Sequence, residues 1–160
     1  KTTTHLVPLL MQVAGGELAE MKVLGDDYPT RDGSAIRDSL HISDLAAAHV
    51  LALRHIMNGK GSVTLNLGTS KGSTVKEMLA AARLATGKPV PAAIHPRRAG
   101  DPPMLVADAS AARSVLGWTP HHSDLSAILG TAWAWEKKQN RLGKIGAFAS
   151  DNDKQEAKAC

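Results

Sequence analysis

Aromatic residues and cysteine are scarce in this 160-residue sequence. Phe, Trp and Tyr together make up 3% of it, so the core must be built from Ala, Leu, Val, Ile and Met. The single cysteine, Cys160, leaves no disulfide framework, which favours a reducing, cytoplasmic setting. No apolar run reaches the roughly 18 residues that span a bilayer, and we expect no signal peptide. We therefore predict a cytoplasmic globular chain without a membrane partner.

Several catalytic motifs are missing as well. The sequence has no G-x-G-x-x-G turn or P-loop to cradle phosphates, no H-E-x-x-H or paired cysteines to bind a metal, and no G-x-S-x-G for a serine nucleophile. The net charge of +4 invites a nucleic-acid partner, but the basic residues are spread along the chain without interleaved aromatics for base stacking. Because the metal-binding motifs are missing, we predict no metal. We also predict no nucleic-acid partner, because an anionic small molecule explains the positive charge equally well.

Apolar spacing and capping residues predict an α/β pattern. We expect helices over residues 4–16, 43–58, 74–85, 108–117 and 124–140, and strands over residues 21–25, 62–69 and 88–96. Ser43 would cap the second helix, and Thr74 with Glu77 would form a capping box on the third. The buried side of the second helix would carry Leu45, Val50, Leu53 and Met57. The chain turns polar and aperiodic near Arg141, so we divide it into a folded region, 1–140, and a disordered tail, 141–160.

Three arginines lie in predicted loops. Arg37 occurs in GSAIRDS, and Arg97 and Arg98 open the run RRAGDPP. A guanidinium group matches phosphate oxygens bidentately, and each charge-assisted hydrogen bond contributes about 1.5–3 kcal/mol. The competing interpretation is structural, with Arg37 paired to Asp38 and Arg98 to Asp101. Sequence spacing leaves both interpretations open.

Three longer stretches resemble a known family. They read GDDYPTRDGSAIRDSLHISDLAAAHVLAL, NLGTSKGSTVKEML and RRAGDPPMLVADASAARSVLGW. In order and with little interruption, these stretches resemble the C-terminal half of the UDP-glucose 4-epimerase (UDP-galactose 4-epimerase) family of extended short-chain dehydrogenase/reductases. The resemblance implies the C-terminal substrate-binding part of an extended Rossmann-type fold, including edge elements of its sheet. It also implies UDP-glucose and UDP-galactose as ligands, NAD as cofactor, a role in galactose metabolism and a homodimeric full-length enzyme.

The resemblance assigns roles to nine residues. Arg37 and Arg98 would contact the substrate diphosphate, Asp101 would accept hydrogen bonds from the uridine ribose, and Arg97 would be peripheral. The uracil and sugar pocket would be lined, largely through backbone groups, by His5, Leu6, Lys22, Val23, Leu24 and Leu105. One departure is Ser39, where the family usually has a tyrosine.

The catalytic half of the family site is not found in these residues. The family uses a Tyr-x-x-x-Lys pair, whereas Tyr28 is the single tyrosine and Asp32 follows it four positions later. The resemblance places the NAD-binding domain upstream of Lys1, and the sequence begins without Met. We therefore favour a partial epimerase, inactive by itself, over a non-catalytic nucleotide-sugar-binding fragment. An epimerase or dehydratase for UDP-xylose or UDP-N-acetylglucosamine is the alternative within the family.

A partial fold would leave apolar surface uncovered. In the family the helix from Ser43 and the strand at 62–69 belong to the edge of a larger sheet. Without the rest of that sheet we expect their apolar faces to be exposed, and we expect the isolated chain to be marginally stable or to associate.

Overall fold

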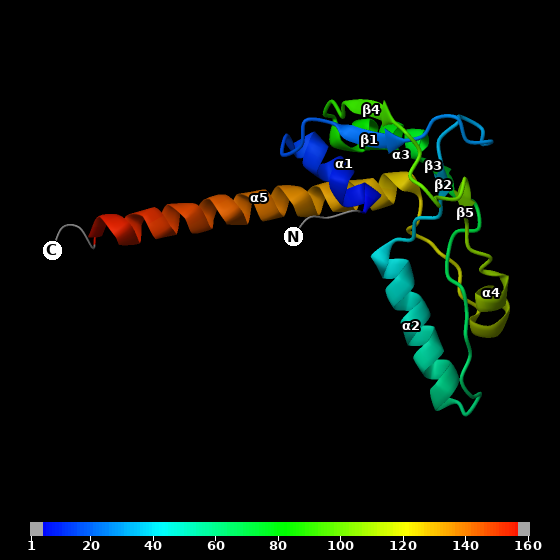
Figure 1. The fold of residues 1–160 in the computed structure, drawn as a ribbon. Helices are drawn as coiled ribbons and strands as arrows, with labels where there is room; N and C mark the ends of the chain where they lie inside the picture. Colours follow the sequence, from blue (N-terminus) through cyan, green and yellow to red (C-terminus); the bar gives the residue numbers. More distant parts are fainter. Residues whose placement is uncertain (1–4, 157–160) are drawn as a thin grey trace.

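Residues 5–156 are described in the computed structural model, with side chains described as far as Asn140. Short strands and longer helices are mixed along the chain, so the predicted α/β class is confirmed (Figure 1). The elements are, in order, α1 (Leu6–Gly15), β1 (Met21–Leu24), β2 (Ile36–Arg37), α2 (Ile42–Met57), β3 (Ser73–Thr74), α3 (Val75–Thr86), β4 (Ala92–His95), β5 (Met104–Leu105), α4 (Ser110–Leu116) and α5 (Leu125–Glu156).

Three helices and a parallel strand pair form the larger core, which we call the helical region. Helices α1, α3 and α5 pack on one another, and β1 pairs with β4 beside them (Figure 1). Leu10, Ala82 and Leu129, one from each helix, are fully buried at their centre. No aromatic residue belongs to the buried set of this core, but Trp118 and Tyr28 are buried elsewhere, so the prediction of a core without aromatic residues holds only for the helical region.

Local signals end and begin these helices as predicted. Gly16 and Gly87 follow α1 and α3 in the left-handed conformation, which satisfies the last helical carbonyl groups. The capping box on α3 is present: the amide of Glu77 donates to the Thr74 hydroxyl, and the amide of Thr74 donates to the Glu77 carboxylate. The prediction for this helix is therefore confirmed at both ends.

A second sheet of three short strands lies next to the helical region. Strand β2 is central, antiparallel to β3 and parallel to β5. Arg37 is the register partner of Ser73 on one side and of Leu105 on the other. This sheet therefore brings an arginine from the long loop next to the segment that follows the Arg97–Arg98 pair.

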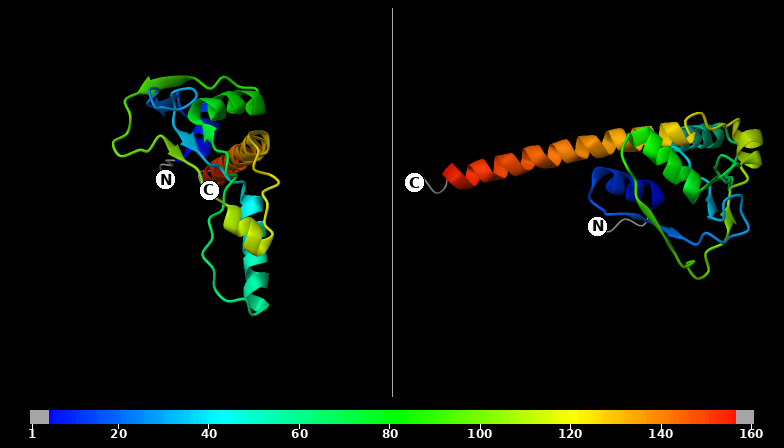
Figure 2. Two further views of the ribbon diagram at one scale, coloured as in Figure 1. Left: turned by 90° about the vertical axis from the view of Figure 1, so that its right-hand side faces the viewer. Right: turned by 90° about the horizontal axis from the view of Figure 1, so that it is seen from above.

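Helices α2 and α4 form a smaller unit, which we call the arm. It projects away from the helical region in Figure 1 and in the left view of Figure 2. Its buried set is small and consists of Ala48, Ala109, Ala112 and Trp118. The Trp118 Nε1–H group donates to the carbonyl of Asp44 at 2.9 Å, which joins the segment after α4 to the first turn of α2 across 74 residues of sequence.

The predicted buried side of α2 is wrong. Val50, Leu53 and Met57 are exposed, Met57 to 76%, whereas Asp44 and Ala48 are buried. The helix packs against α4 along one narrow line of small side chains, so its longer apolar residues point to solvent. The predicted cap is also displaced, because His41 caps the helix through Nδ1, which accepts from the Ser43 amide at 3.1 Å.

The strand predicted over 62–69 is wrong as well. These residues run extended beside α2, but within 5–156 no other strand pairs with them. A strand requires a hydrogen-bonded neighbour, so a β-branched sequence by itself gives an extended segment here. Val63 is 41% exposed, and together with α2 this agrees with the expected uncovered apolar surface.

The last helix is longer than predicted. Helix α5 continues past Asn140 to Glu156, so the predicted helix end is wrong. The run from 141 to 156 holds good helix formers and no proline, which permits this extension. The division of the chain at 141 stays a prediction, and residues 157–160 lie outside the described residues. No helix in the described part is long and apolar enough to cross a membrane.

Candidate functional site

Arg37 and Asp101 form a pair at the edge of the three-stranded sheet. The Arg37 Nη2 atom lies 2.6 Å from Asp101 Oδ1, and both side chains are about three-quarters buried, with 25% and 28% exposure. Arg37 Nη1 also donates to the carbonyl of Ile36 at 2.7 Å. The guanidinium group is thereby fixed from both sides before any ligand arrives.

Arg98 lies at the other end of the turn that carries Asp101. The Asp101 amide donates to the Arg98 carbonyl at 3.1 Å, and Gly100 between them has a φ of 76°. A left-handed residue at this position favours glycine, so Gly100 shapes the turn. The Arg98 side chain is exposed and makes no hydrogen bond or ion pair with the described residues. Its charge is therefore available to an anion.

The two ion pairs of the structural interpretation, Arg37 with Asp38 and Arg98 with Asp101, are not formed. Asp38 instead accepts hydrogen bonds from the amides of Thr69 (2.9 Å), Ser70 (3.2 Å) and Ala107 (3.3 Å). This carboxylate ties two distant segments to β2 and is fully used. Arg37 therefore turns away from its sequence neighbour and reaches the turn of Arg98.

Arg97 has a structural environment. Its Nε atom donates to the Asp27 carboxylate at 2.6 Å, and its guanidinium carbon lies 4.3 Å from the centre of the Tyr28 ring. The hydrogen bond from Arg97 lowers the pKa of Asp27. A Cβ atom at Gly25 would come within 2.7 Å of both Arg97 and Tyr28, so the glycine permits this stack. Sequence reasoning placed Arg97 at the periphery but missed the role of Tyr28.

Leu105 lies beside Arg37 as its register partner in β5, and it is 54% exposed. The remaining predicted residues lie elsewhere. His5 precedes α1, Leu6 begins it, and Lys22, Val23 and Leu24 lie in β1, which belongs to a different sheet from β2. Lys22 and Leu24 are exposed and Val23 is buried. The structure thus brings Arg37, Asp101, Leu105 and the turn of Arg98 together, and it leaves the other five apart from them.

Asp44 is a buried carboxylate that sequence reasoning treated only as a first-turn acid. It accepts from the amides of His121 (2.9 Å) and His122 (2.8 Å) and from the Ser123 hydroxyl (2.6 Å). Burial raises the pKa of Asp44, but these three hydrogen bonds outweigh burial, so its pKa lies below the ordinary value of 3.8. Both histidine side chains are exposed, as predicted. No group of His, Cys, Asp or Glu in the described residues could hold a metal ion.

The comparisons first define the class of protein. The family model described as GDP-mannose 4,6 dehydratase matches residues 1–127. The chain belongs to that family.

Within that family, the chain is similar to individual UDP-glucose 4-epimerases. The chain is 50% identical over 132 residues to the UDP-glucose 4-epimerase of Corynebacterium glutamicum, covering 82% of the chain and 40% of that protein. The solved UDP-glucose 4-epimerase from Stenotrophomonas maltophila, with bound NAD and formylated UDP-arabinopyranose, is 46% identical with a TM-score of 0.85, over 88% of this chain and 42% of that one. The enzyme from Bifidobacterium longum, in complex with NAD+ and UDP, is 38% identical with a TM-score of 0.77, over 86% and 41%. These matches confirm the resemblance to UDP-glucose 4-epimerases and the fold class. The chain spans about two-fifths of the length of these relatives.

Proposed function

We propose that this chain is the UDP-binding part of an NAD-dependent UDP-glucose 4-epimerase that interconverts UDP-glucose and UDP-galactose. The observation that carries the proposal is the Arg37–Asp101 pair, because it fixes one guanidinium group against the turn that presents a second. The fixed Arg37 and the unpaired, exposed Arg98 come from distant segments, and two such cations suit a diphosphate, whose oxygens accept bidentate hydrogen bonds.

Asp101 can serve a ribose while it holds Arg37. Its Oδ1 atom accepts from Arg37, whereas Oδ2 has no donor among the residues of the described structure. A ribose diol supplies O–H donors, and an ionised carboxylate accepts them. In this arrangement Arg37 orients the carboxylate, Asp101 binds the ribose and Arg98 binds the diphosphate.

Strand β1 offers a place for a uracil base. Within residues 5–156 it pairs with β4 on one side only, so its other edge presents backbone donors and acceptors. Val23 is buried, so only its backbone could contact a base, whereas Lys22 and Leu24 present exposed side chains. The role of β1, with His5 and Leu6 near it, stays part of the proposal.

The contribution of this chain to the reaction is anchorage. When bound, NAD supplies hydride transfer to and from the sugar, but the chain has neither a glycine-rich dinucleotide turn nor a Tyr-x-x-x-Lys pair. We propose that the chain alone is inactive. The nucleotide must stay fixed while the sugar changes its orientation, so the binding energy belongs on UDP. A cytoplasmic homodimer in galactose metabolism is part of the same proposal.

A UDP titration with single substitutions tests the site. Arg98→Ala removes a guanidinium group that makes no contact within the described structure, so folding should be unchanged. We expect it to weaken UDP binding roughly tenfold or more, as the loss of a charge-assisted hydrogen bond predicts. Arg54→Ala removes the same charge from the exposed side of α2 and should leave UDP affinity unchanged. Equal UDP affinity of Arg98→Ala and the parent chain, measured by calorimetry, contradicts the assignment.

A further inference from the structure

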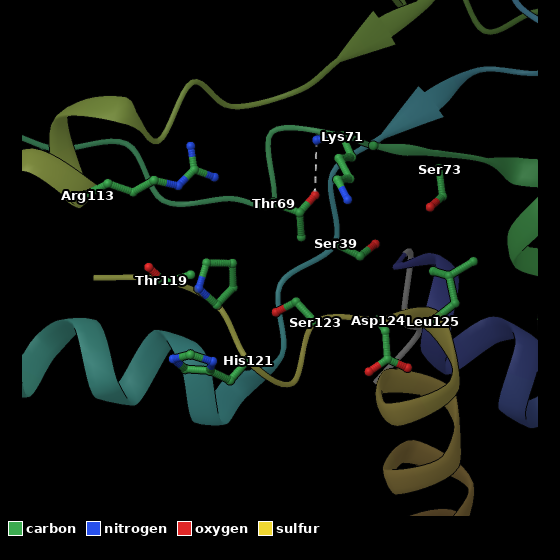
Figure 3. A pocket seen from close by; sticks show the side chains of 12 residues that line it. Ser39, Thr69, Lys71, Ser73, Arg113, Thr119, His121, Ser123, Asp124 and Leu125 are labelled. Atoms are coloured by element: carbon green, nitrogen blue, oxygen red, sulfur yellow. Dashed lines mark hydrogen bonds between the residues drawn. The ribbon is translucent and has the colours of Figure 1, made fainter. Parts of the chain in front are cut away.

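A second polar pocket lies beside the three-stranded sheet, away from the Arg98 turn. It has a volume of about 520 Å³ and lies between the loop 69–73, helix α4 and the segment 119–125 (Figure 3). Lys71 enters it from the loop and Arg113 from α4, on opposite sides of Thr69, and His121 lies below them (Figure 3). Four separate segments of the chain thus build one concave polar surface.

The charge of this pocket is positive. Lys71 supplies an ammonium group and Arg113 a guanidinium group, both of which carry a positive charge and donate hydrogen bonds. Neither Lys71 nor Arg113 belongs to the ion pairs found in the described structure. The lining also holds one carboxylate, Asp124, whose Oδ1 atom accepts from the Ser126 hydroxyl and from the Ala127 amide at the start of α5. Two cations outside the ion pairs of the described structure therefore face a space with one carboxylate, which leaves the charge of the lining positive.

Hydroxyl groups complete the lining. Ser39, Ser73 and Thr119 line the pocket, and their hydroxyl groups make no hydrogen bond with the described residues. Each can rotate to donate to an anion. Phosphate needs several donors around three or four oxygens, and cations together with rotatable hydroxyls meet that need.

The loop that carries Lys71 is held in an unfavourable backbone conformation. Ser70 has a φ of 63°, and it is the one non-glycine residue with positive φ in the described part of the chain. Asp38 fixes the Ser70 amide, and the Ser70 hydroxyl accepts from Arg113 Nη2 at 3.4 Å. Non-glycine residues keep such a conformation where the surrounding structure requires it, often at binding sites. As a result, the hydrogen bond between Ser70 and Arg113 joins the loop that carries Lys71 to helix α4 before a ligand binds.

We propose that this pocket binds a phosphate group, either as inorganic phosphate or as the phosphate of a small monoester. The site is separate from the UDP site: none of Arg37, Arg98 and Asp101 lines it. Its volume exceeds that of a single phosphate, so an organic group attached to the phosphate would also have space.

Calorimetric titration of the chain with inorganic phosphate tests the proposal. The double variant Lys71→Ala/Arg113→Ala should weaken phosphate binding roughly tenfold or more, since it removes both cations. The charge-retaining variant Lys71→Arg/Arg113→Lys should keep binding within a few-fold. The matched control Arg54→Ala/Lys60→Ala removes two charges from the far end of α2, and it should leave phosphate binding unchanged.

Three results would overturn the proposal: no saturable phosphate binding by the parent chain, equal weakening by the α2 control, or loss of phosphate binding in Arg98→Ala. Circular dichroism of each variant verifies folding. The UDP affinity of Lys71→Ala/Arg113→Ala should equal that of the parent, so this proposal and the UDP proposal fail independently. A second titration with phenyl phosphate identifies the source: tighter binding than inorganic phosphate supports a monoester, and weaker binding supports the free ion.

Discussion

The helical region and the arm are held together by different forces. The helical region buries ten residues around Leu10, Ala82 and Leu129, eight of them in α1, α3 and α5. In the arm, α2 and α4 bury four residues, three of them alanines. Two carboxylates compensate in the arm and at its attachment: the buried Asp44 fixes the segment 121–123, and the partly buried Asp38 fixes residues 69–70.

The difference shows why the arm can expose apolar residues and still keep its position. Hydrophobic stabilisation scales with the area buried, and apart from Trp118 the buried residues of the arm are alanines, which bury little. Hydrogen bonds to a buried carboxylate are directional, so they fix position even where the apolar area is small. The proposed UDP site and the proposed phosphate pocket both lie next to Asp38 or to a segment that it binds. Arg37 directly precedes Asp38, and Lys71 directly follows Ser70, whose amide donates to Asp38.

Truncation of a core residue should have the largest effect on stability. Leu129→Ala removes a fully buried side chain of α5 in the helical region, and we expect it to lower the free energy of unfolding by about 2–5 kcal/mol. Leu53→Ala is the matched change in the arm, where Leu53 is 58% exposed, and it should change stability by less than about 0.5 kcal/mol. Urea denaturation measures both. Similar losses for the two variants would remove the distinction between the regions.

Removal of the Asp44 charge should have an intermediate effect. Asp44→Asn weakens three hydrogen bonds to the segment 121–123, so we expect a loss of about 1–3 kcal/mol in unfolding free energy. Asp108→Asn is the control, because Asp108 is exposed and accepts from one amide, that of Ser110; its loss should stay below about 1 kcal/mol.

The pH dependence of unfolding identifies Asp44 as a charged group. Its folded pKa is lowered below 3.8, so ionised Asp44 stabilises the fold above that value, and this stability is lost as pH falls through the lower folded pKa. The difference in stability between the parent chain and Asp44→Asn should therefore shrink below about pH 4. A difference that stays constant between pH 6 and pH 3 would mean that the carboxylate charge has no part in holding the segment.

The smallest effect on stability is expected for the exposed face of α2. Leu53→Lys/Met57→Lys changes two exposed residues, so the unfolding free energy should move by less than about 0.5 kcal/mol. Binding of an apolar dye and self-association at high concentration should fall, because the change interrupts an exposed apolar surface. Dye fluorescence and light scattering measure this. Unchanged dye binding would show that the dye does not bind to the exposed face of α2.

Local sequence signals predicted the helices better than the strands. Gly16, Gly87 and Gly117 end α1, α3 and α4 in the left-handed conformation, and each stop was predicted from the glycine itself. The segment 62–69 has a strand-like composition, but a strand exists only with a neighbour, and composition does not supply one. The buried side of α2 was mispredicted for the same reason, because periodicity reveals an apolar face without revealing what covers it.

In the candidate site, too, some features were predicted from the sequence and others are visible only in the structure. The resemblance assigned roles to Arg37, Arg98 and Asp101, and these roles stay predictions. The sequence analysis considered only Asp38 as an acidic partner of Arg37, whereas the carboxylate that Arg37 meets, Asp101, lies 64 positions away. The pocket of Lys71 and Arg113 was not predicted, since 42 residues separate the two cations and the family resemblance assigned no role to either of them.

The amino-acid order by itself determined where α1, α3 and α4 stop, what the net charge is and which residues carry the family resemblance, because capping, charge and motifs depend on near neighbours. Tertiary structure decided which acid each arginine meets, which face of α2 is covered and where two unpaired cations share a pocket. Those outcomes depend on how β2, the 97–101 turn and α4 are placed in space, and an ion pair forms only between groups that folding brings within a few ångströms.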